Sequence, residues 1–405
     1  MSGMDLRSAA PVDHAALESI LAPGAGGRML PAEAYTSEAV LAWERRHLFA
    51  ESWVCAGRSA DLGDAGDRRA LRVGDDSVVL VRGDDGVLRG FYNVCRHRGH
   101  QLQPEDTTVQ RNAIHCPYHA WTYALDGTLK FTPRFDAPEG FDPARFPLVP
   151  VRTEEWCGWV FVNASGDARP LAEHLGDLDA EMARWEPERL VVGASHSYEL
   201  NANWKLPIEN YHECFHCAAI HPEFCVVSPP NSGDNCIDHD GMWIGGWMVL
   251  ADEAETMAFD GRSEGVMLPG VDETWRRRVH YIGLLPNLLI SPHPDYVMTH
   301  RFEPLGPDRT FVECQWLFDP EAVSGPGFDP AYAVDLWDLT NRQDWAACEG
   351  VQRGVASRGY RPGPFAQDED AVTQFVQLMA QTYRDGALPA HVPFARNPTA
   401  QELSR

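Results

Sequence analysis

Two short motifs separated by eighteen residues constrain the fold of this chain most strongly. Cys95-Arg96-His97 and Cys116-Pro117-Tyr118-His119 each supply one cysteine and one histidine. Two thiolates and two imidazoles from two loops suit a zinc ion, or an iron–sulfur cluster in which two histidines replace two cysteines on one iron. Zinc sites more often carry paired Cys-x-x-Cys knuckles, whereas one ligand of each kind per loop lets each loop reach both irons. The motifs therefore favour a 2Fe-2S cluster over structural zinc.

The residues around these motifs have the pattern of a small all-β domain. Short apolar runs end at turn residues: 77–81 before Asp84-Asp85-Gly86, 122–125 before Asp126-Gly127, and a further run at 159–162. Residues 37–50 have a helical pattern with Ser37 as its N-cap, and residues 1 to 30 are expected to be loosely ordered. We expect an N-terminal helical segment at 1–48, packed on the last domain, and the β domain at 49–165.

The remaining residues, 166–405, combine helices with longer strands, so the fold class is α+β. Helical signal covers 171–185, and 310–318 alternates, with its apolar side chains on one face. Two helices are predicted to close the chain. The first covers 331–355, and the second carries an apolar stripe from Val372 to Tyr383 before a stop at Gly386.

A second group of possible metal ligands lies at 209–222. His212-Glu213-Cys214-Phe215-His216 matches the zinc-protease pattern His-Glu-x-x-His, but the extended pattern needs a third histidine where Pro222 stands. Another pairing joins His216 to His221. On one continuous helix these side chains diverge by about 140°. Pro222 disfavours helical geometry at His221, so a helix that ends between them lets both imidazoles converge.

A downstream carboxylate completes a possible iron site. On the predicted helix 331–355, Asp344 shares a face with apolar side chains, namely Trp337, Cys348, Val351 and Val355. A buried carboxylate needs a charged partner or a metal. The pattern alone leaves two explanations equally open, a salt bridge to an arginine such as Arg342 or Arg353, and a two-histidine, one-carboxylate iron site.

These motifs resemble one protein family over nearly the whole chain. Residues 91–99 and 116–123 are similar to the Rieske domains of ring-hydroxylating oxygenases, and residues 203–217 with His221-Pro222 are similar to the catalytic domain of their alpha subunits. The resemblance implies a helix-grip catalytic domain, an antiparallel sheet with long helices, in which His216, His221 and Asp344 hold mononuclear Fe(II). Cys95, His97, Cys116 and His119 then hold a Rieske 2Fe-2S cluster.

The same resemblance implies roles for residues beyond the ligands. Glu213, one turn before His216 on the expected helix, matches the carboxylate that links an iron histidine to a cluster histidine of the neighbouring subunit. Here that histidine is His119 of another chain, which implies a ring, most simply a homotrimer. Asn210 is expected to line the site, and His212 to pack or face solvent. Many dioxygenases of the family have Asp at the position of Glu213, and in having Glu this chain is similar to the quaternary-amine branch.

The expected activity is that of an oxygenase component, a monooxygenase or dioxygenase using O2. The motif details are similar to glycine betaine and stachydrine demethylases, so the expected reaction is oxidative N-demethylation of a betaine-like quaternary amine. Hydroxylation or dihydroxylation of an aromatic acid is the alternative, and an electron-transfer or redox-sensing iron–sulfur protein is an alternative of another class. Candidate aromatic faces for the cation are three tryptophans, although tryptophans more often belong to the core: Trp243, Trp247 and Trp316.

Composition limits the partners. Lys and Arg total 34 against 59 Asp and Glu, a net charge of −25, which opposes binding to nucleic acid or to anionic membranes. The longest apolar run, 241–251, is shorter than the roughly 18 residues of a membrane span, and no signal peptide is evident, so a cytoplasmic location is expected. Eight of the ten cysteines are expected to be reduced and outside the metal sites. NAD(P)H is expected to act only through a separate flavin and 2Fe-2S reductase, because a Gly-rich dinucleotide motif is lacking.

Overall fold

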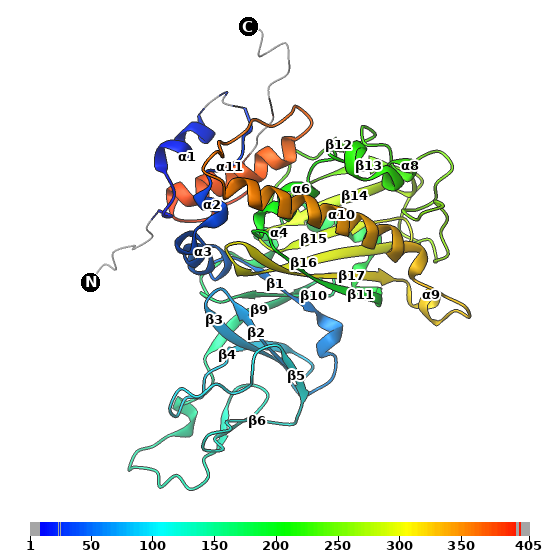
Figure 1. Cartoon of the computed structure of the whole chain (residues 1–405). Helices are drawn as coiled ribbons and strands as arrows, with labels where there is room; N and C mark the ends of the chain where they lie inside the picture. Colours follow the sequence, from blue (N-terminus) through cyan, green and yellow to red (C-terminus); the bar gives the residue numbers. More distant parts are fainter. Residues whose placement is uncertain (1–8, 23, 25, 394–396, 398–405) are drawn as a thin grey trace. The chain divides into compact units, whose positions relative to one another are not determined.

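The computed structural model describes residues 9–22, 24, 26–393 and 397 (Figure 1). Its internal contacts divide the chain into two compact units. We call Arg45–Arg169 the β unit, and the residues up to Glu44 together with those from Pro170 onwards the α+β unit. The division of the sequence into a helical segment at 1–48 and two domains at 49–165 and 166–405 stays a prediction.

The β unit is built on a seven-stranded antiparallel sheet. The strands, in spatial order, are β1 (Val54–Arg58), β10 (Trp159–Asn163), β9 (Pro150–Trp156), β4 (Leu88–Tyr92), β3 (Asp76–Arg82), β2 (Asp67–Val73) and β5 (Thr107–Gln110). β2 and β3 are joined by the two-residue loop Gly74-Asp75. Gly74 has φ 62°, and a Cβ there would lie 2.3 Å from the Arg45 carbonyl oxygen, so glycine is required.

The loop with Cys116 and His119 belongs to a small three-stranded sheet, whereas the loop with Cys95 and His97 follows β4 of the seven-stranded sheet. The small sheet consists of β6 (Ile114–His115), β7 (Thr122–Tyr123) and β8 (Leu129–Phe131). The strand expected at 122–125 is therefore shorter than its apolar run. Trp121 and Tyr123 are buried beside the sheet, with phenylalanines 135, 141 and 146 packed against the same cluster. The cysteines of both cluster loops thus pack in one aromatic core.

A second seven-stranded antiparallel sheet forms the base of the α+β unit. In spatial order its strands are β11 (Val191–Leu200), β17 (Arg309–Phe318), β16 (Tyr296–Gly306), β15 (Leu288–Pro292), β14 (Arg278–Leu284), β13 (Trp243–Val249) and β12 (Asp234–Asn235). The alternation predicted for 310–318 is confirmed, because Val312, Cys314, Trp316 and Phe318 are all fully buried.

Helices cover this sheet, and the two longest are α10 and α11 (Figure 1). Their bounds are α1 (His14–Leu21), α2 (Glu33–Thr36), α3 (Glu38–Glu44), α4 (Leu171–Leu175), α5 (Leu178–Met182), α6 (Lys205–Tyr211), α7 (Cys217–Ile220), α8 (Pro222–Val227), α9 (Pro320–Ser324), α10 (Ala331–Val355) and α11 (Asp370–Asp385). α10 has the predicted bounds and lies across the strands. α11 ends as predicted at Gly386, whose φ is 73°.

Three expectations about helices are corrected. Residues 9–30 are not loosely ordered throughout, because α1 begins at an Asp13 cap and buries Leu17 and Ile20. The helix expected over 37–50 changes at Arg45 into the π-helical turn η1 (Arg45–Phe49). The signal at 171–185 is split into short helices, because Gly176 with φ 57° ends α4.

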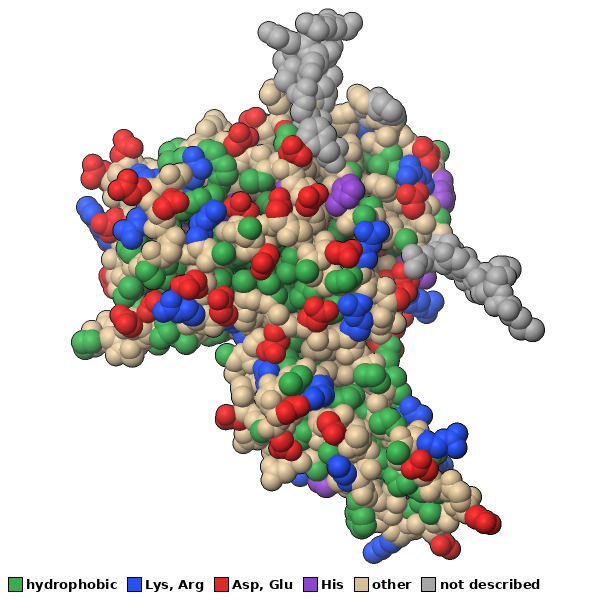
Figure 2. Space-filling view, turned by 180° about the vertical axis from the view of Figure 1, so that it is seen from behind, with side chains coloured by type: hydrophobic (Ala, Val, Ile, Leu, Met, Phe, Trp, Pro, Cys, Tyr) green, Lys and Arg blue, Asp and Glu red, His purple; other side chains and the backbone are tan. Residues whose placement is uncertain are grey.

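The surface agrees with the acidic composition. On the face in Figure 2, Asp and Glu side chains are spread among Lys and Arg rather than gathered at one place. None of the helices within the described residues combines the length and apolar character needed to cross a bilayer.

Candidate metal centres and active site

The two cluster loops of the β unit share one backbone geometry. The Gly99 N–H donates to the Cys95 carbonyl, and the Ala120 N–H donates to the Cys116 carbonyl, both at 3.0 Å. Gly99 and Ala120 both have positive φ, at 72° and 57°. Each loop therefore turns tightly just after its histidine, which brings its cysteine and histidine to one side.

The side chains at the loop tips form the donor set predicted for the cluster. Cys95 and Cys116 are 2% and 3% exposed, and the ring centroids of His97 and His119 lie 4.7 Å apart. The Nδ1 atoms of both histidines are buried without a hydrogen-bond partner among the described residues. Buried polar atoms are rarely left unpaired in proteins. Two such imidazoles beside two buried thiols fit a 2Fe-2S group with mixed ligation.

Neighbouring aromatic residues fix this arrangement. The Trp121 ring stacks on His97, with centroids 4.7 Å apart. The Tyr123 hydroxyl accepts the Arg96 N–H at 3.0 Å and lies 3.3 Å from Cys95 Sγ. The sequence showed Tyr123 only as part of a motif and gave no role for it. A hydroxyl at a sulfur ligand is one of the features that tune the potential of an iron–sulfur group.

The segment with the second histidine pair differs from the expected helix. α6 ends at Tyr211, and α7 begins only at Cys217, so Glu213 and His216 do not share a helix. His216 is instead the N-cap of α7 and His221 its C-cap, with Pro222 opening α8. The break before Pro222 is as predicted. The earlier break was not predicted, and a disulfide between Cys214 and Cys217 lies in the turn that follows it.

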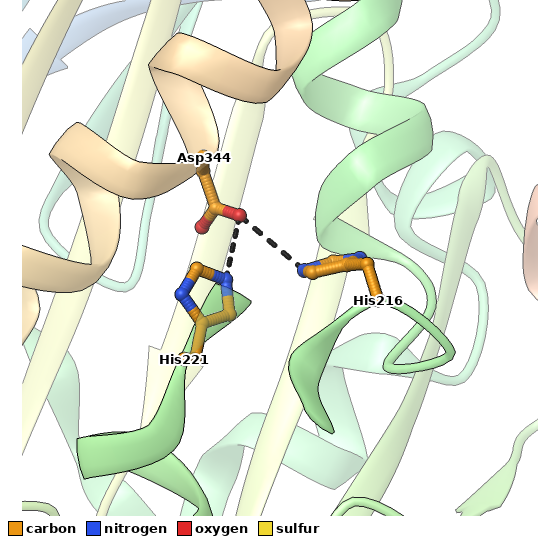
Figure 3. A group of neighbouring side chains, drawn as sticks. All are labelled: His216, His221 and Asp344. Atoms are coloured by element: carbon orange, nitrogen blue, oxygen red, sulfur yellow. Dashed lines mark hydrogen bonds and ion pairs between the residues drawn. The ribbon is translucent and has the colours of Figure 1, made fainter. Parts of the chain in front are cut away.

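His216, His221 and Asp344 point toward one another (Figure 3). Oδ1 of Asp344 lies 2.8 Å from Nε2 of His221 and 3.3 Å from Nε2 of His216. The arginine alternative is not observed, because Arg342 pairs with Asp338 at 2.7 Å, and Arg353 lies 3.9 Å from Glu349. The prediction that Val351 belongs to the buried apolar face around Asp344 is wrong, because its side chain is 41% exposed. Around the helix axis Val351 lies about 40° from Trp337, at the edge of the apolar stripe.

The electrostatics of the three residues suit a bound cation. Burial lowers the pKa of His216, but hydrogen bonds to Asp344 and Glu213 outweigh it and raise that pKa to about 10. Burial acts to raise the pKa of Asp344, but its hydrogen bonds from the two histidines hold it below its usual value. The pocket therefore attracts positive charge, such as that of a divalent metal ion.

Two side chains orient the imidazoles through hydrogen bonds to their Nδ1 atoms. Nδ1 of His216 lies 2.6 Å from Oε1 of Glu213, and Nδ1 of His221 lies 2.7 Å from Oε1 of Gln343. With Nδ1 donating, both Nε2 atoms are free to bind a metal. Within the described residues, these two histidines and Asp344 are the group whose ligand atoms fit a metal ion. Two histidines and one carboxylate are typical of mononuclear Fe(II). Sequence reasoning missed Gln343, since only the fold brings it to His221.

His212 does not join this group. It is 5% exposed, and its Nε2 has no hydrogen-bond partner among the described residues. A Cβ added at Gly283 would lie 2.3 Å from that atom, so the ring is packed against β14. The zinc-protease pattern His212 to His216 therefore does not form a metal site here.

A cavity of about 340 Å³ adjoins the three residues. Its lining includes Asn210, as expected, together with six aromatic side chains, namely Tyr211, Phe215, Phe224, Trp247, Tyr281 and Trp337. Of the three tryptophans suggested from the sequence, only Trp247 lines it. Trp243 donates its indole N–H to Asp177 at 3.0 Å, and Trp316 is fully buried in the core. Trp337 was missed as a lining residue, although it shares a helix face with Asp344.

The cysteines also depart from expectation. Cys214 and Cys217 form a disulfide, so the eight cysteines outside the metal motifs are not all reduced. The motif Cys-x-x-Cys was present in the sequence, but it was interpreted only through the histidine it contains. The bond spans the turn that contains His216.

Comparison with known protein families identifies the family to which this chain belongs. Residues 52–150 match the family described as "Rieske [2Fe-2S] domain", and residues 187–385 match "Ring hydroxylating alpha subunit (catalytic domain)". The chain therefore belongs to the catalytic alpha subunits of the Rieske non-haem iron oxygenases. It is an oxidoreductase of α+β fold that uses a Rieske 2Fe-2S cluster, mononuclear iron and O2.

Several relatives are named as oxygenase subunits of monooxygenases. The chain is 32% identical over 389 residues to the glycine betaine monooxygenase oxygenase subunit of Chromohalobacter salexigens, covering 88% of this chain and 86% of the relative. It is 38% identical over 366 residues to the carnitine monooxygenase oxygenase subunit of Acinetobacter pittii, covering 86% and 93%. A solved quaternary ammonium Rieske monooxygenase with L-carnitine superposes with a TM-score of 0.74, at 27% identity, covering 91% of this chain and 98% of that one.

Proposed function

We propose that this chain is the oxygenase component that oxidatively demethylates a betaine-like quaternary amine. The observation that carries the proposal is the aromatic cavity beside His216, His221 and Asp344. Tyr211, Tyr281 and Trp337 offer ring surfaces to a trimethylammonium group, whereas one face of Trp247 is covered by the Arg278 guanidinium, 3.8 Å from the ring centroid. Each cation–π contact contributes roughly 0.5–2 kcal/mol, more when water is excluded. The names of the glycine betaine and carnitine relatives support the same substrate class.

The charge of the cavity favours this substrate over an aromatic acid, the alternative. Among the described lining residues are the carboxylates of Glu213, Asp234, Asp344, Asp368 and Asp370, and no lysine or arginine. An aromatic carboxylate meets repulsion from these carboxylates, and no lysine or arginine among the described lining residues pairs with it. The ammonium group of a quaternary amine is attracted by the same charges.

We assign the metal ligands as follows. Cys95, His97, Cys116 and His119 hold the cluster, and His216, His221 and Asp344 hold the iron. When bound, the two centres supply electron transfer and O2 activation. The chain contributes orientation: Glu213 accepts the Nδ1 proton of His216, Gln343 accepts that of His221, and Asn210 lines the cavity wall. The aromatic faces would bind the ammonium group in the cavity that the iron ligands also line.

The assembly is proposed from family resemblance. A homotrimer brings His119 of one chain to Glu213 of the next, so that electrons cross from the cluster of one subunit to the iron of its neighbour. Glu213 is suited to this link because one of its carboxylate oxygens contacts His216 Nδ1. The reductase is proposed to carry flavin and a 2Fe-2S cluster and to draw electrons from NAD(P)H.

A substrate screen tests the proposal. The purified protein with a surrogate flavin reductase and NADH is offered glycine betaine, carnitine, stachydrine and benzoate-type acids, and formaldehyde is measured. We expect formaldehyde from at least one quaternary amine in proportion to NADH and O2 consumed. Hydroxylated aromatic product with no formaldehyde from any amine would establish the alternative substrate class instead. The His221→Ala variant serves as the control that lacks an iron ligand and is expected to be inactive.

A further inference from the structure

The disulfide next to His216 is not part of the chemistry described so far. Cys214 and Cys217 enclose Phe215 and His216, and their Cα atoms lie 4.9 Å apart, within the range that a disulfide spans. Both cysteines line the cavity. A thiol pair at bonding distance is therefore open to small molecules that reach or leave the proposed iron site.

The two sulfurs differ in exposure and position. Cys217 is 4% exposed and packs in the hydrophobic core, whereas Cys214 is partly exposed. Sγ of Cys217 lies 3.9 Å from Nε2 of His216, the ring nitrogen that faces Asp344. Cys214 is thus the more accessible member, and Cys217 is held where it can meet a modified Cys214.

The oxygenase reaction supplies an oxidant at this place. When electrons reach O2 without oxidation of substrate, the two-electron product is hydrogen peroxide, released into the cavity. Peroxide converts thiols to disulfides in two steps. The Cys214 sulfur attacks one peroxide oxygen and the O–O bond breaks. This step gives a sulfenic acid on Cys214 and releases one water. The Cys217 sulfur then attacks the Cys214 sulfur, the S–O bond breaks, and a second water leaves. Two thiols and one peroxide thus give one disulfide and two waters.

We propose that Cys214 and Cys217 are a reversible thiol–disulfide site that consumes hydrogen peroxide formed in the adjoining cavity. In the oxidised state, which the structure holds, the bond closes the turn between α6 and α7. In the reduced state the pair is a two-electron reductant beside His216, which spares the imidazoles from oxidation. The reactivity of the pair stands on its own geometry, and only the source of the peroxide rests on the proposed iron site.

Thiol mapping tests the reactivity. The full-length holoenzyme is reduced with dithiothreitol, desalted without oxygen and treated with about one equivalent of peroxide, the stoichiometry of the two-step reaction. Mass spectrometry then follows each cysteine. We expect the Cys214–Cys217 disulfide to form at least about tenfold faster than Cys225 is oxidised, because Cys225 is partly exposed but forms no disulfide. A pair that resists reduction, or that reacts no faster than Cys225, overturns the proposal.

Two variants separate the roles of the sulfurs. In Cys217→Ser, Cys214 is expected to stop at the sulfenic acid, which dimedone traps, while Cys225→Ser is expected to form the disulfide at the normal rate. Absence of the trapped adduct on Cys214 contradicts the assigned order. If Cys217→Ser does not fold, wild-type protein quenched with dimedone in the first seconds gives the same readout.

A separate arm tests the peroxide source. Reduced parent protein and reduced Asp344→Ala, which lacks a proposed iron ligand, are each supplied with reductase, NADH and O2 but no substrate. Disulfide formation that is faster in the parent than in Asp344→Ala supports release from the iron site. Equal disulfide formation in both proteins overturns that source. The added-peroxide result does not depend on turnover, so failure of the proposed function and failure of this inference are distinguishable.

Discussion

Gln343 shows how a single uncharged side chain supports the proposed iron site. Its Oε1 lies 2.7 Å from Nδ1 of His221 and so holds the proton on that nitrogen. Loss of such a partner typically weakens metal binding by about 10- to 100-fold. We expect Gln343→Leu to bind Fe(II) more weakly by this factor, measured by competition with a chelator, while the visible spectrum of the cluster stays unchanged.

The matched control is Gln343→Glu, which keeps an acceptor at the same position. This variant is expected to retain most of the Fe(II) affinity. If Gln343→Leu and Gln343→Glu both bind iron as tightly as the parent, the hydrogen bond to His221 has no role in holding the metal.

Glu209 gives a pH-dependent prediction remote from the metal ligands. Burial raises its pKa to about 7, against the hydrogen bond from Tyr35 and the charge of Lys205. The folded state therefore holds the proton more tightly than the unfolded state, whose glutamate pKa is about 4.3. The stability from this group is fully present below pH of about 4.3 and is lost as pH rises through about 7. We expect Glu209→Gln, which keeps the acceptor for Tyr35, to be more stable than the parent at pH 8 but not near pH 4.5.

Urea unfolding of both proteins across this pH range measures the difference. A stability difference that is constant with pH contradicts the assignment, because it shows that the proton affinity of Glu209 does not change on folding.

At this scale the sequence predicted the residues that chemistry restricts most. Cys95, His97, Cys116 and His119 were selected from their types and spacing. His216, His221 and Asp344 were candidates by pattern and became a ligand set only through the family resemblance. The structure groups the seven residues as two sets. Gln343, Tyr123 and Trp337 were missed as parts of the sites. Amides and aromatic rings are common residues, and only the tertiary fold brings these three to a ligand or a cavity.

Helix α10 carries Asp344, so its packing determines how firmly the carboxylate is held. Leu336 is fully buried on the sheet side of this helix, in the same core cluster as Trp337. Removal of a buried leucine side chain costs about 2–5 kcal/mol. We expect Leu336→Ala to lower the free energy of unfolding by this amount in urea titrations.

Val351 on the same helix is the matched control, because it is 41% exposed. Val351→Ala is expected to change stability by less than about 0.5 kcal/mol. Equal losses from both variants would show that the two helix faces are not packed as described.

Element boundaries were predictable where one signal acted alone. The apolar stripe of α10 runs without a glycine or proline until near its end, and its bounds are those predicted. The segment 209–216 has a good helical pattern, yet the helix stops at Tyr211, and the Cys214–Cys217 bond lies in the turn that follows. The pattern of apolar and polar residues does not show where such a turn interrupts a helix.

For the whole molecule, the proposed electron path between subunits makes a prediction about mixed assemblies. His119→Ala removes a proposed cluster ligand, and His216→Ala removes a proposed iron ligand, so each homo-oligomer is expected to be inactive. Co-expressed in equal amounts, they form rings in which one pairing of neighbours in four joins an intact cluster to an intact iron. We expect about a quarter of the parent activity if the ring is closed and mixing is random.

Mass spectrometry of the intact assembly confirms that mixing occurred. A mixed assembly as inactive as its parents contradicts transfer between chains and favours a path within one chain.

The most direct test of the central claim is a single turnover. Protein with both centres chemically reduced is mixed with O2 and a quaternary amine that the screen identifies, and formaldehyde is measured without reductase. The account predicts formaldehyde comparable in amount to the protein chains, and none from Asp344→Ala with its cluster intact. No formaldehyde from the parent protein, or equal amounts from both, would contradict the claim that His216, His221 and Asp344 form the site of N-demethylation.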